Sequence, residues 1–585
     1  MHAPWSGFLR YLLVVAFVVA TLSGGAQPAA AATAYLDGFI TSSSTGAPLA
    51  NVCVTLGPPT LCTTATDADG YYKIDGFVPG PTFWVVYYNK EGYARLEAHN
   101  VQIDANNTRL NWALNPGTAT CARPEQPNTT VYLPNITKTL GGPTGWYTPF
   151  IVQNTNRFTI TSLQVDFYSF STGILVARRD ICALKPGQSF ADVPNNDNDL
   201  SGDSQYAVVV KSYMTDIVAV VNEHQGVGDR TEAGSYVGAS SGATKVSLPN
   251  IVRRFYGFVT PIIIQNVGTA GTTATASFIS FDGTKTASIT RQIEPGRSQF
   301  IDPNSEIDLI DQTQYAVTVS ASQPLSVIVN THNDAPTVGA PVMYSANGIV
   351  GGADTIYGPY AVKNVVGIGK GLSTIVVQNT GTASVTPSLT FTPLAGSGTT
   401  TFNGPAVAAG AAWVFDPRFI NGDTTQILCG AAATTGCLAN GEYSFVGSGG
   451  VGGKIAAVVN VIGDTTAAGY SASTQPATRL FLPNVTRRLG GTDGWSTPLV
   501  LQSVTATSLH LSWYKFADGS LAASQDVPIT PKQSLRIDPR DILGLANETQ
   551  YAVVVDATGG TATGIVVELN FQGGDGAMIY EGFAR

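Results

Sequence analysis

Apolar and polar residues alternate along many short segments of this chain. The alternation is clear at residues 163–167 and again at residues 509–513, where every second position is apolar. A period of two is typical of a β-strand with one buried face. Turn sequences such as Phe281-Asp282-Gly283 separate these segments, and helical periodicity never extends beyond a turn or two. The pattern therefore predicts an all-β fold with almost no helix after the N-terminal leader.

Four copies of one unit make up the chain from residue 129 onward. In each copy an apolar block precedes Gln-Asn or Gln-Ser, and the blocks end at Asn154, Asn266, Asn379 and Ser503. The steps of 112, 113 and 124 residues are too long for a solenoid repeat, and they suit a self-sufficient immunoglobulin-like β-sandwich. We expect tandem β-sandwich domains, arranged as a rod or bent string, at residues 129–240, 241–349, 350–474 and 475–585.

Residues 35–116 form a separate unit, and residues 117–128 form a linker to the first repeat. The unit contains Thr45-Gly46-Ala47-Pro48-Leu49, then Thr66-Asp67-Ala68-Asp69-Gly70-Tyr71, then Gly92-Tyr93. In this order the motifs resemble those of the carboxypeptidase regulatory-like domain, a small transthyretin-like β-sandwich, although Phe39 stands where that family usually has Val. The resemblance implies the fold and leaves the function open, because such domains occur beside many unrelated partners.

Residues 1–34 have the organisation of a secretory signal peptide. A short polar segment ending at Arg10 precedes an apolar run at residues 11–22, and Ala32-Thr33-Ala34 matches the small-residue cleavage pattern. The alternative is an uncleaved anchor, but the run is short for a membrane span. No later segment reaches the apolar length of a membrane helix. We therefore expect a secreted or cell-surface protein with no membrane span once the signal is removed.

The composition narrows the classes of partner. Hydrophobic residues make up 44% of the chain and charged residues only 12%, so each unit can bury a core. The formal net charge is −9 and no basic stripe is visible, which argues against binding of nucleic acid.

Six cysteines without C-x-x-C spacing favour disulfides in an oxidising compartment over a zinc site. A hairpin turning at Gly57-Pro58 would place Cys53 opposite Cys62 and allow a bridge. Cys429 and Cys437 flank a flexible loop inserted in the third repeat. By elimination, the remaining pair is Cys121–Cys182.

Two short motifs look catalytic but lack the required context. Gly238-Ala239-Ser240-Ser241-Gly242 matches G-x-S-x-G, yet no helix follows the serine. Gly367-Ile368-Gly369-Lys370-Gly371 has no Ser or Thr after the lysine, so it is not a phosphate-binding loop. His224 and His332 occupy matched positions in the first two repeats, and without a ligand cluster we interpret them as surface-loop histidines. We therefore expect no enzyme activity.

One acidic loop in the first repeat is a candidate calcium site. Asp197, Asp199, Ser201 and Asp203 place oxygen ligands at alternate positions, and Gly202 allows a turn. Hard cations favour such oxygen ligands, although the glutamate that closes an EF-hand is missing. The alternative is a solvated acidic turn. Calcium is the one candidate cofactor.

The strand at residues 83–88 is the candidate binding face. The family resemblance puts Phe83, Val85 and Tyr87 on the core side with Tyr72 and Ile74. Strand parity then sends Trp84, Val86 and Tyr88 outward, beside Tyr71 and Lys73. Tyr71, Trp84 and Tyr88 would then form an aromatic surface that either stacks on a polysaccharide or is covered by protein, namely the linker, the next repeat or another copy.

Trp146 and Trp495 occupy matched loops in the first and last repeats. They are either exposed ligand platforms or packing residues between neighbouring repeats.

These observations favour a structural or adhesive protein made of tandem sandwiches. The first alternative is a carbohydrate-binding protein, and a weaker one is an accessory subunit of a secreted hydrolase. The expected partners are polysaccharides or other surface proteins.

Overall fold

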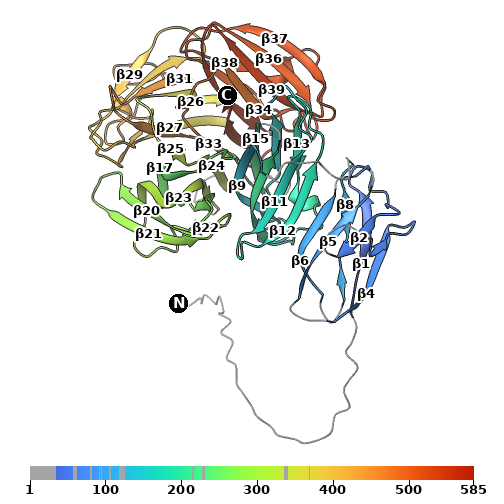
Figure 1. The fold of residues 1–585 in the computed structure, drawn as a ribbon. Coiled ribbons are helices and arrows are strands. Elements are labelled where there is room, and N and C mark those ends of the chain that lie inside the picture. The colour runs from blue at the N-terminus through green and yellow to red at the C-terminus, as the bar shows by residue number, and fades with distance from the viewer. Residues whose placement is uncertain are drawn as a thin grey trace, which may run out of the picture.

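The computed structural model describes residues 34–56, 62–78, 82–90, 92–93, 95–103, 107–116, 126–213, 216–226, 231–334, 340–367 and 369–585. Apart from Ala34, the predicted signal peptide lies outside these residues, as does most of the predicted linker at 117–128. Within the described residues the regular elements are strands and three short 3-10 helices. The all-β prediction is therefore confirmed (Figure 1). No helix in this part of the chain has the length and apolar character needed to cross a membrane.

The first domain is a sandwich of two small sheets. One sheet joins β4, β1, β7 and β8, and the other contains β3, β2, β5 and β6 in that order. Its strands are β1 (Ala34–Ser42), β2 (Cys53–Leu56), β3 (Thr64–Ala65), β4 (Tyr71–Phe77), β5 (Phe83–Asn89), β6 (Leu96–Gln102), β7 (Thr108–Arg109) and β8 (Trp112–Leu114).

Repeat 1 shows the plan of the four repeats. In each repeat we call the sheet whose edge strand lies at the centre of the four repeats the inner sheet, and the other sheet the outer sheet. In repeat 1 the inner sheet has the order β13-β10-β15-β16, and the outer sheet contains β12, β11, β14 and β9. Its elements are β9 (Thr129–Lys138), β10 (Phe150–Asn154), β11 (Leu163–Ser169), β12 (Leu175–Ile181), β13 (Ser189–Asp192), η1 (Pro194–Asn196), β14 (Ser204–Ser212), β15 (Ile217–Gln225) and β16 (Glu232–Val237).

Repeat 2 follows the same plan, except that the long strand β23 runs through both sheets. Its strands are β17 (Ala243–Phe255), β18 (Phe258–Val259), β19 (Ile262–Asn266), β20 (Thr272–Ser280), β21 (Thr286–Ile293), β22 (Ser298–Ile301), β23 (Thr313–Asn333), β24 (Val342–Asn347) and β25 (Ile349–Val350).

In repeat 3 the inner sheet contains β30, β27, β32 and β33, and the outer sheet contains β29, β28, β31 and β26. Its elements are β26 (Thr355–Gly367), β27 (Gly369–Asn379), β28 (Ser388–Pro393), β29 (Thr400–Asn403), β30 (Ala412–Phe415), η3 (Ile420–Gly422), β31 (Gly441–Ser448), β32 (Ile455–Ile462) and β33 (Ala467–Ser471).

In repeat 4 the inner sheet has the order β38-β35-β40-β41, and the outer sheet has the order β37-β36-β39-β34-β42. Its elements are β34 (Arg479–Arg487), β35 (Leu499–Ser503), β36 (Ser508–Lys515), β37 (Leu521–Pro528), β38 (Ser534–Ile537), η4 (Pro539–Asp541), β39 (Thr549–Thr558), β40 (Ala562–Leu569), β41 (Ala577–Glu581) and β42 (Phe583–Ala584).

The four repeats form a closed ring, so the predicted rod or bent string is wrong. The inner-sheet edge strands β16, β24, β33 and β41 meet at the centre, and each contacts the next in a cycle. Figure 1 shows the four repeats arranged around this centre. Each inner sheet also packs on the outer sheet of the preceding repeat. The Oγ of Ser298 in repeat 2 donates to the Pro134 carbonyl of repeat 1 at 2.9 Å. The Oγ of Ser189 in repeat 1 donates to the Pro483 carbonyl of repeat 4 at 2.9 Å, which closes the ring.

Apolar side chains on the inner sheets hold this ring together. Ile263 and Ile328 of repeat 2 belong to the hydrophobic core of repeat 1. Ile151 and Val220 of repeat 1 belong in the same way to the core of repeat 4. The inner-sheet strands are therefore buried on both faces, which explains why their apolar blocks do not alternate with polar residues.

One carboxylate joins three repeats at the centre of the ring. Asp575 of repeat 4 is fully buried. Its Oδ2 accepts the backbone N–H of Met343 at 2.7 Å and that of Ala233 at 3.3 Å, and its Oδ1 accepts the N–H of Ala467 at 2.9 Å. The register of the inner sheets makes these three donors equivalent residues of repeats 2, 1 and 3. Asp575 therefore ties the inner edges of the other three repeats to the fourth.

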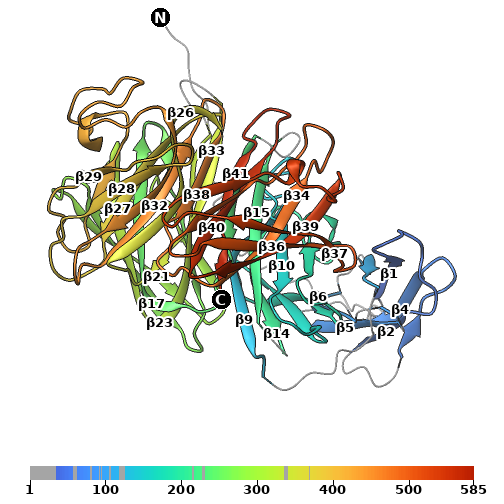
Figure 2. The ribbon, with the colours of Figure 1, turned by 90° about the horizontal axis from the view of Figure 1, so that it is seen from above.

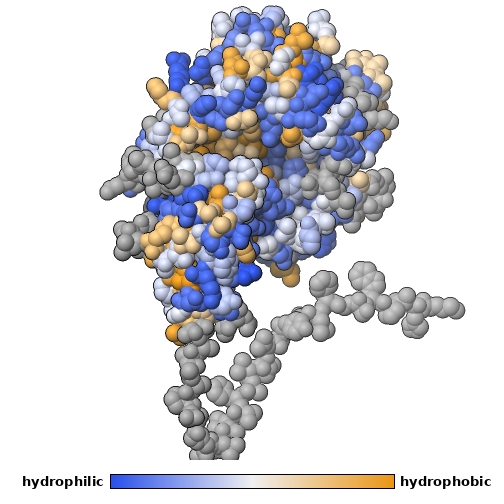
Figure 3. Space-filling view, turned by 90° about the vertical axis from the view of Figure 1, so that its right-hand side faces the viewer, coloured by the Kyte–Doolittle hydropathy of each residue, from blue (hydrophilic) through white to orange (hydrophobic). Residues whose placement is uncertain are grey.

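The first domain extends the outer sheet of repeat 1. β6 pairs antiparallel with β12, so the two domains share one eight-stranded sheet. Arg178 supports this junction through Asp166, at 2.6 Å from Nε to Oδ1, and through Glu97 at 3.8 Å. The first domain is thus fixed to the side of the ring (Figure 2). Polar residues cover most of the face shown in Figure 3, with apolar residues scattered among them.

Two of the predicted disulfides are present, Cys53–Cys62 and Cys429–Cys437. Cys182 is also disulfide-bonded, and its predicted partner Cys121 lies outside the described residues. The hairpin register that suggested the first bridge is wrong, because Cys53 pairs with Ala65. Cys62 precedes β3, and the bridge still forms because the two Cα atoms lie 5.4 Å apart.

Candidate functional site

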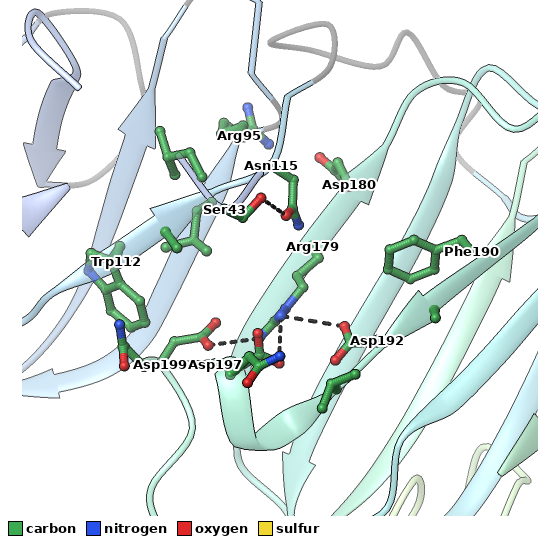
Figure 4. Close-up of a pocket in the computed structure, with 17 residues that line it drawn as sticks. Ser43, Arg95, Trp112, Asn115, Arg179, Asp180, Phe190, Asp192, Asp197 and Asp199 are labelled. Carbon is green, nitrogen blue, oxygen red and sulfur yellow. Dashed lines mark hydrogen bonds and ion pairs between the residues drawn. The ribbon is translucent and has the colours of Figure 1, made fainter. Parts of the chain in front are cut away.

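A polar pocket of about 340 Å³ lies between the first domain and repeat 1. Figure 4 shows its two walls. Trp112 and Asn115 come from the first domain, and Arg179, Asp192 and Phe190 come from repeat 1. We call it the interdomain pocket.

Arg179 occupies the position that was predicted for calcium. Its Nη1 lies 2.8 Å from Asp197 Oδ2 and 3.4 Å from Asp192 Oδ2, and its Nη2 lies 2.7 Å from Asp199 Oδ1 (Figure 4). Burial raises the pKa of Asp192 and of Asp199, while the charge of Arg179 lowers both. The acidic loop therefore pairs with an arginine from β12 and is not left open for a divalent cation.

The other two predicted calcium ligands point elsewhere. The Ser201 carbonyl accepts the Tyr206 hydroxyl at 3.0 Å, and Asp203 Oδ1 accepts the backbone N–H of Gly141 at 2.8 Å. The predicted calcium set of Asp197, Asp199, Ser201 and Asp203 is therefore not assembled, because the loop folds around Arg179.

The predicted aromatic face does not exist, because the parity of β5 is the reverse of that expected. Tyr88 is fully buried, and its hydroxyl lies 2.8 Å from the Tyr72 hydroxyl of the opposite sheet. Trp84 packs against the same core, whereas Phe83 is 60% exposed. The hydrogen bond between the two hydroxyls lets large tyrosines fill this core.

Tyr71, the third predicted binding residue, lies apart from Trp84 and Tyr88. Its hydroxyl donates to Asp37 Oδ2 at 3.1 Å, and its ring lies 5.2 Å from that of Phe39. Tyr71, Trp84 and Tyr88 therefore share no surface.

A second pocket, of about 270 Å³, lies between repeats 1 and 2. Trp146 of repeat 1 and Ile263 and Phe300 of repeat 2 contribute apolar surface. Thr137 of repeat 1 and Asn330 of repeat 2 contribute polar atoms. We call it the repeat 1–2 pocket. Its volume is near the lower end of the roughly 300–1,000 Å³ that is typical of small-molecule sites.

The polar end of this pocket is built around the buried carboxylate of Glu223. Its Oε1 accepts the amide N–H groups of Asn135 at 2.7 Å and of Asn330 at 3.0 Å. Its Oε2 accepts the Ser345 hydroxyl. Burial raises the pKa of Glu223, and these three hydrogen bonds lower it. The carboxylate is thus committed to the interface between the two repeats.

The interface between repeats 4 and 1 contains a similar arrangement without the serine hydroxyl, and Glu568 Oε2 has no hydrogen-bond partner among the described residues. Glu568 Oε1 accepts the amide N–H groups of Asn484 at 2.6 Å and of Asn222 at 3.3 Å. Burial raises the pKa of Glu568 to about 7. In this copy Trp495, the equivalent of Trp146, packs on His224 with ring centroids 5.6 Å apart.

The matched tryptophans therefore have different surroundings. Trp495 is a packing residue between repeats, whereas Trp146 lines a cavity. The interpretation of His224 as a surface-loop residue is wrong, because it is buried between Trp495 and Tyr147. Sequence reasoning missed the two glutamates. The two glutamates occupy equivalent positions, because Val221 and Val566 pair with the equivalent residues Phe150 and Leu499. No local sequence signal reveals the match, since Glu223 follows Asn222 whereas Glu568 precedes Asn570.

Glu232, His332 and Asp334 form the group of potential metal ligands found among the described residues, with ligand atoms within 4.8 Å of one another. His332 Nδ1 hydrogen-bonds Asp334 Oδ1, which lowers the pKa of Asp334. Burial and the nearby Asp334 raise the pKa of Glu232 to about 9. A protonated Glu232 accounts for the close approach of two acidic side chains.

Comparison with known proteins identifies no family for this chain. No protein-family model and no curated protein sequence matches the chain. The resemblance of residues 35–116 to the carboxypeptidase regulatory-like domain thus stays a prediction. The solved structure titled Thermotoga maritima 1070 is 16% identical, with a TM-score of 0.16, and the match covers 18% of this chain and 94% of that one.

Two pilus proteins also match in structure. BcpA, the major pilin subunit of Bacillus cereus, is 11% identical, with a TM-score of 0.12, over 49% of this chain and 95% of that one. The RrgB pilus protein of Streptococcus pneumoniae is 8% identical, with a TM-score of 0.11, over 77% of this chain and 91% of that one. The scores are too low to relate the arrangement of domains in these proteins to the ring.

Proposed function

We propose that this chain is a non-catalytic extracellular protein with a structural or adhesive role. The observation that carries the proposal is the closed ring, in which each hydrophobic core includes side chains of the next repeat. Such a ring is a rigid body that presents its loops in fixed positions. The first domain adds to that body through the shared sheet at β6 and β12.

Disulfides support the extracellular assignment. Cys53–Cys62, Cys429–Cys437 and the bonded Cys182 leave no free thiol among the described cysteines. Bridges of this kind persist in oxidising compartments and are rare in the cytosol. The predicted signal peptide at residues 1–34 supports the same location.

The chemistry of the pockets supports a non-catalytic role. The carboxylates of the interdomain pocket pair with Arg179, and Glu223 accepts hydrogen bonds from two amides and a hydroxyl. Groups held in this way stabilise an interface and are not poised to move a proton or attack a substrate.

The test uses the protein as its own organism makes it. Culture fluid, intact cells and cytoplasm are separated, and each fraction is treated with a maleimide–polyethylene glycol reagent and probed with an antibody. We expect the chain outside the cytoplasm, with no thiol modified before reduction. Beads coated with the protein should bind producer cells or their surface polymer. Cytoplasmic chain with free thiols, or inert beads, would contradict the proposal.

A further inference from the structure

We propose that the repeat 1–2 pocket binds one neutral sugar residue. The inference goes beyond the structural role and does not depend on it. It rests on the difference between two copies of one site, at the repeat 1–2 interface and at the repeat 4–1 interface.

The first difference is a buried hydroxyl without a partner. Thr137 is 2% exposed and lines the pocket, and its Oγ1 has no hydrogen-bond partner among the described residues. In the other copy, the equivalent Thr486 donates its hydroxyl to the Trp495 carbonyl at 3.0 Å. Buried polar groups rarely remain unpaired in native proteins, so the Thr137 hydroxyl points to a missing partner.

A second polar atom at this site also lacks a partner. Asn330 donates its amide N–H to Glu223, while its Oδ1 is buried and accepts no hydrogen bond from the described residues. The pocket thus offers a hydroxyl, which can donate or accept, and a carbonyl oxygen, which accepts. A ligand that matches both must carry groups that donate and accept, as sugar hydroxyls do.

The second difference explains why this copy is open. At the repeat 4–1 interface, His224 stacks on Tyr147 at 5.4 Å and fills the space beside Trp495. Strand pairing places Val259 opposite His332, just as Tyr147 lies opposite His224. The smaller valine gives His332 no aromatic support, and His332 turns to Asp334 instead. Space is therefore left beside Trp146.

The walls suit the apolar face of a sugar ring. Trp146 is partly exposed in the pocket, and Phe300 is 51% exposed beside it. Aromatic side chains provide a large, flat contact area of this kind. The volume of about 270 Å³ suits one ring rather than a longer chain.

Charge favours a neutral ligand. An anion would meet the Glu223 carboxylate at the polar end of the pocket. A cation would find both oxygens of that carboxylate already bonded to Asn135, Asn330 and Ser345. A charged ligand would therefore gain little in exchange for its lost hydration.

The experiment titrates the full chain with glucose, galactose, mannose and N-acetylglucosamine, by calorimetry and by tryptophan fluorescence. We expect one site per chain for at least one of these sugars. Trp146→Ala should weaken binding about tenfold or more, and Thr137→Val about two- to tenfold. The matched variants Trp495→Ala and Thr486→Val should bind as the unmodified protein does.

Polysaccharides that end in the binding sugar distinguish a free monosaccharide from a chain terminus as the natural ligand. If both bind and both respond to Trp146→Ala, the pocket recognises a terminal residue. The inference is overturned if none of the four sugars binds. It is also overturned if Trp146→Ala binds as tightly as the unmodified protein, or if choline binds in place of the sugars.

Discussion

The carboxylate of Asp575 is the most informative single group to remove. It accepts backbone N–H groups from Ala233, Met343 and Ala467, which belong to three different repeats. Asp575→Ala leaves these three buried donors without an acceptor. At about 1 kcal/mol for each net hydrogen bond, the loss in the free energy of unfolding is about 3 kcal/mol. The cost of burying the carboxylate, which raises its pKa, is relieved in the variant and partly offsets this loss.

Two measurements check this prediction. Urea unfolding followed by tryptophan fluorescence should show a lower midpoint for Asp575→Ala. Hydrogen–deuterium exchange should be faster in peptides that contain Ala233, Met343 and Ala467, although all three lie far from residue 575 in the sequence. Asp518→Ala is the matched control, because Asp518 accepts one turn N–H at the surface. An unchanged midpoint, or faster exchange confined to repeat 4, would refute the role of Asp575.

Three further predictions concern the interfaces and the acidic loop. The pKa of Glu568 is about 7 in the folded chain and near 4.5 when unfolded, so its stabilising contribution is complete below pH 4.5 and is lost as the pH rises through 7. The loss in the free energy of unfolding is at most roughly 3 kcal/mol. Glu568→Gln should flatten the plot of unfolding free energy against pH between pH 4.5 and 7. A plot for the variant that runs parallel to that of the unmodified protein would contradict the raised pKa of Glu568. Without ligand, Thr137→Val should leave the melting temperature unchanged or raise it. Thr486→Val should lower the melting temperature, because it removes the hydrogen bond to the Trp495 carbonyl. Equal shifts in the two variants would argue against an unpaired Thr137 hydroxyl. Calorimetry with millimolar calcium should show no binding, because Arg179 occupies the acidic loop, and a saturable calcium heat would contradict this geometry.

The strands can be predicted from the sequence because apolar and polar residues alternate along them. The arrangement of the four repeats cannot be predicted in this way. Alternation at residues 163–167 reports one buried face, which any sandwich would provide. The apolar blocks carried more information, since residues 150–152 and 262–264 are apolar at consecutive positions and lie almost fully buried. Consecutive apolar residues indicate burial on both faces. That signal was compatible with a ring, but it does not say which repeat covers which.

The site depended on contacts that no local motif contains. The acidic loop at residues 197–203 resembles a calcium loop until Arg179 of β12 is placed inside it. The family resemblance implies the opposite parity for β5, and the bulge between Trp84 and Val86 shows that this strand is irregular. Trp146 lines a cavity and Trp495 packs on His224 because the neighbouring positions hold Val259 in one interface and Tyr147 in the other. These positions can be matched only when the strand register of both repeats is known.

The closed ring is the central claim, and small-angle X-ray scattering of the chain without residues 1–34 tests it most directly. A compact ring with one domain attached should have a radius of gyration of about 25–30 Å. Five sandwiches of this size in a line would give about 50 Å. A value near the first, with a single compact envelope, is what the ring predicts. A value near the second would contradict the ring and restore the extended rod.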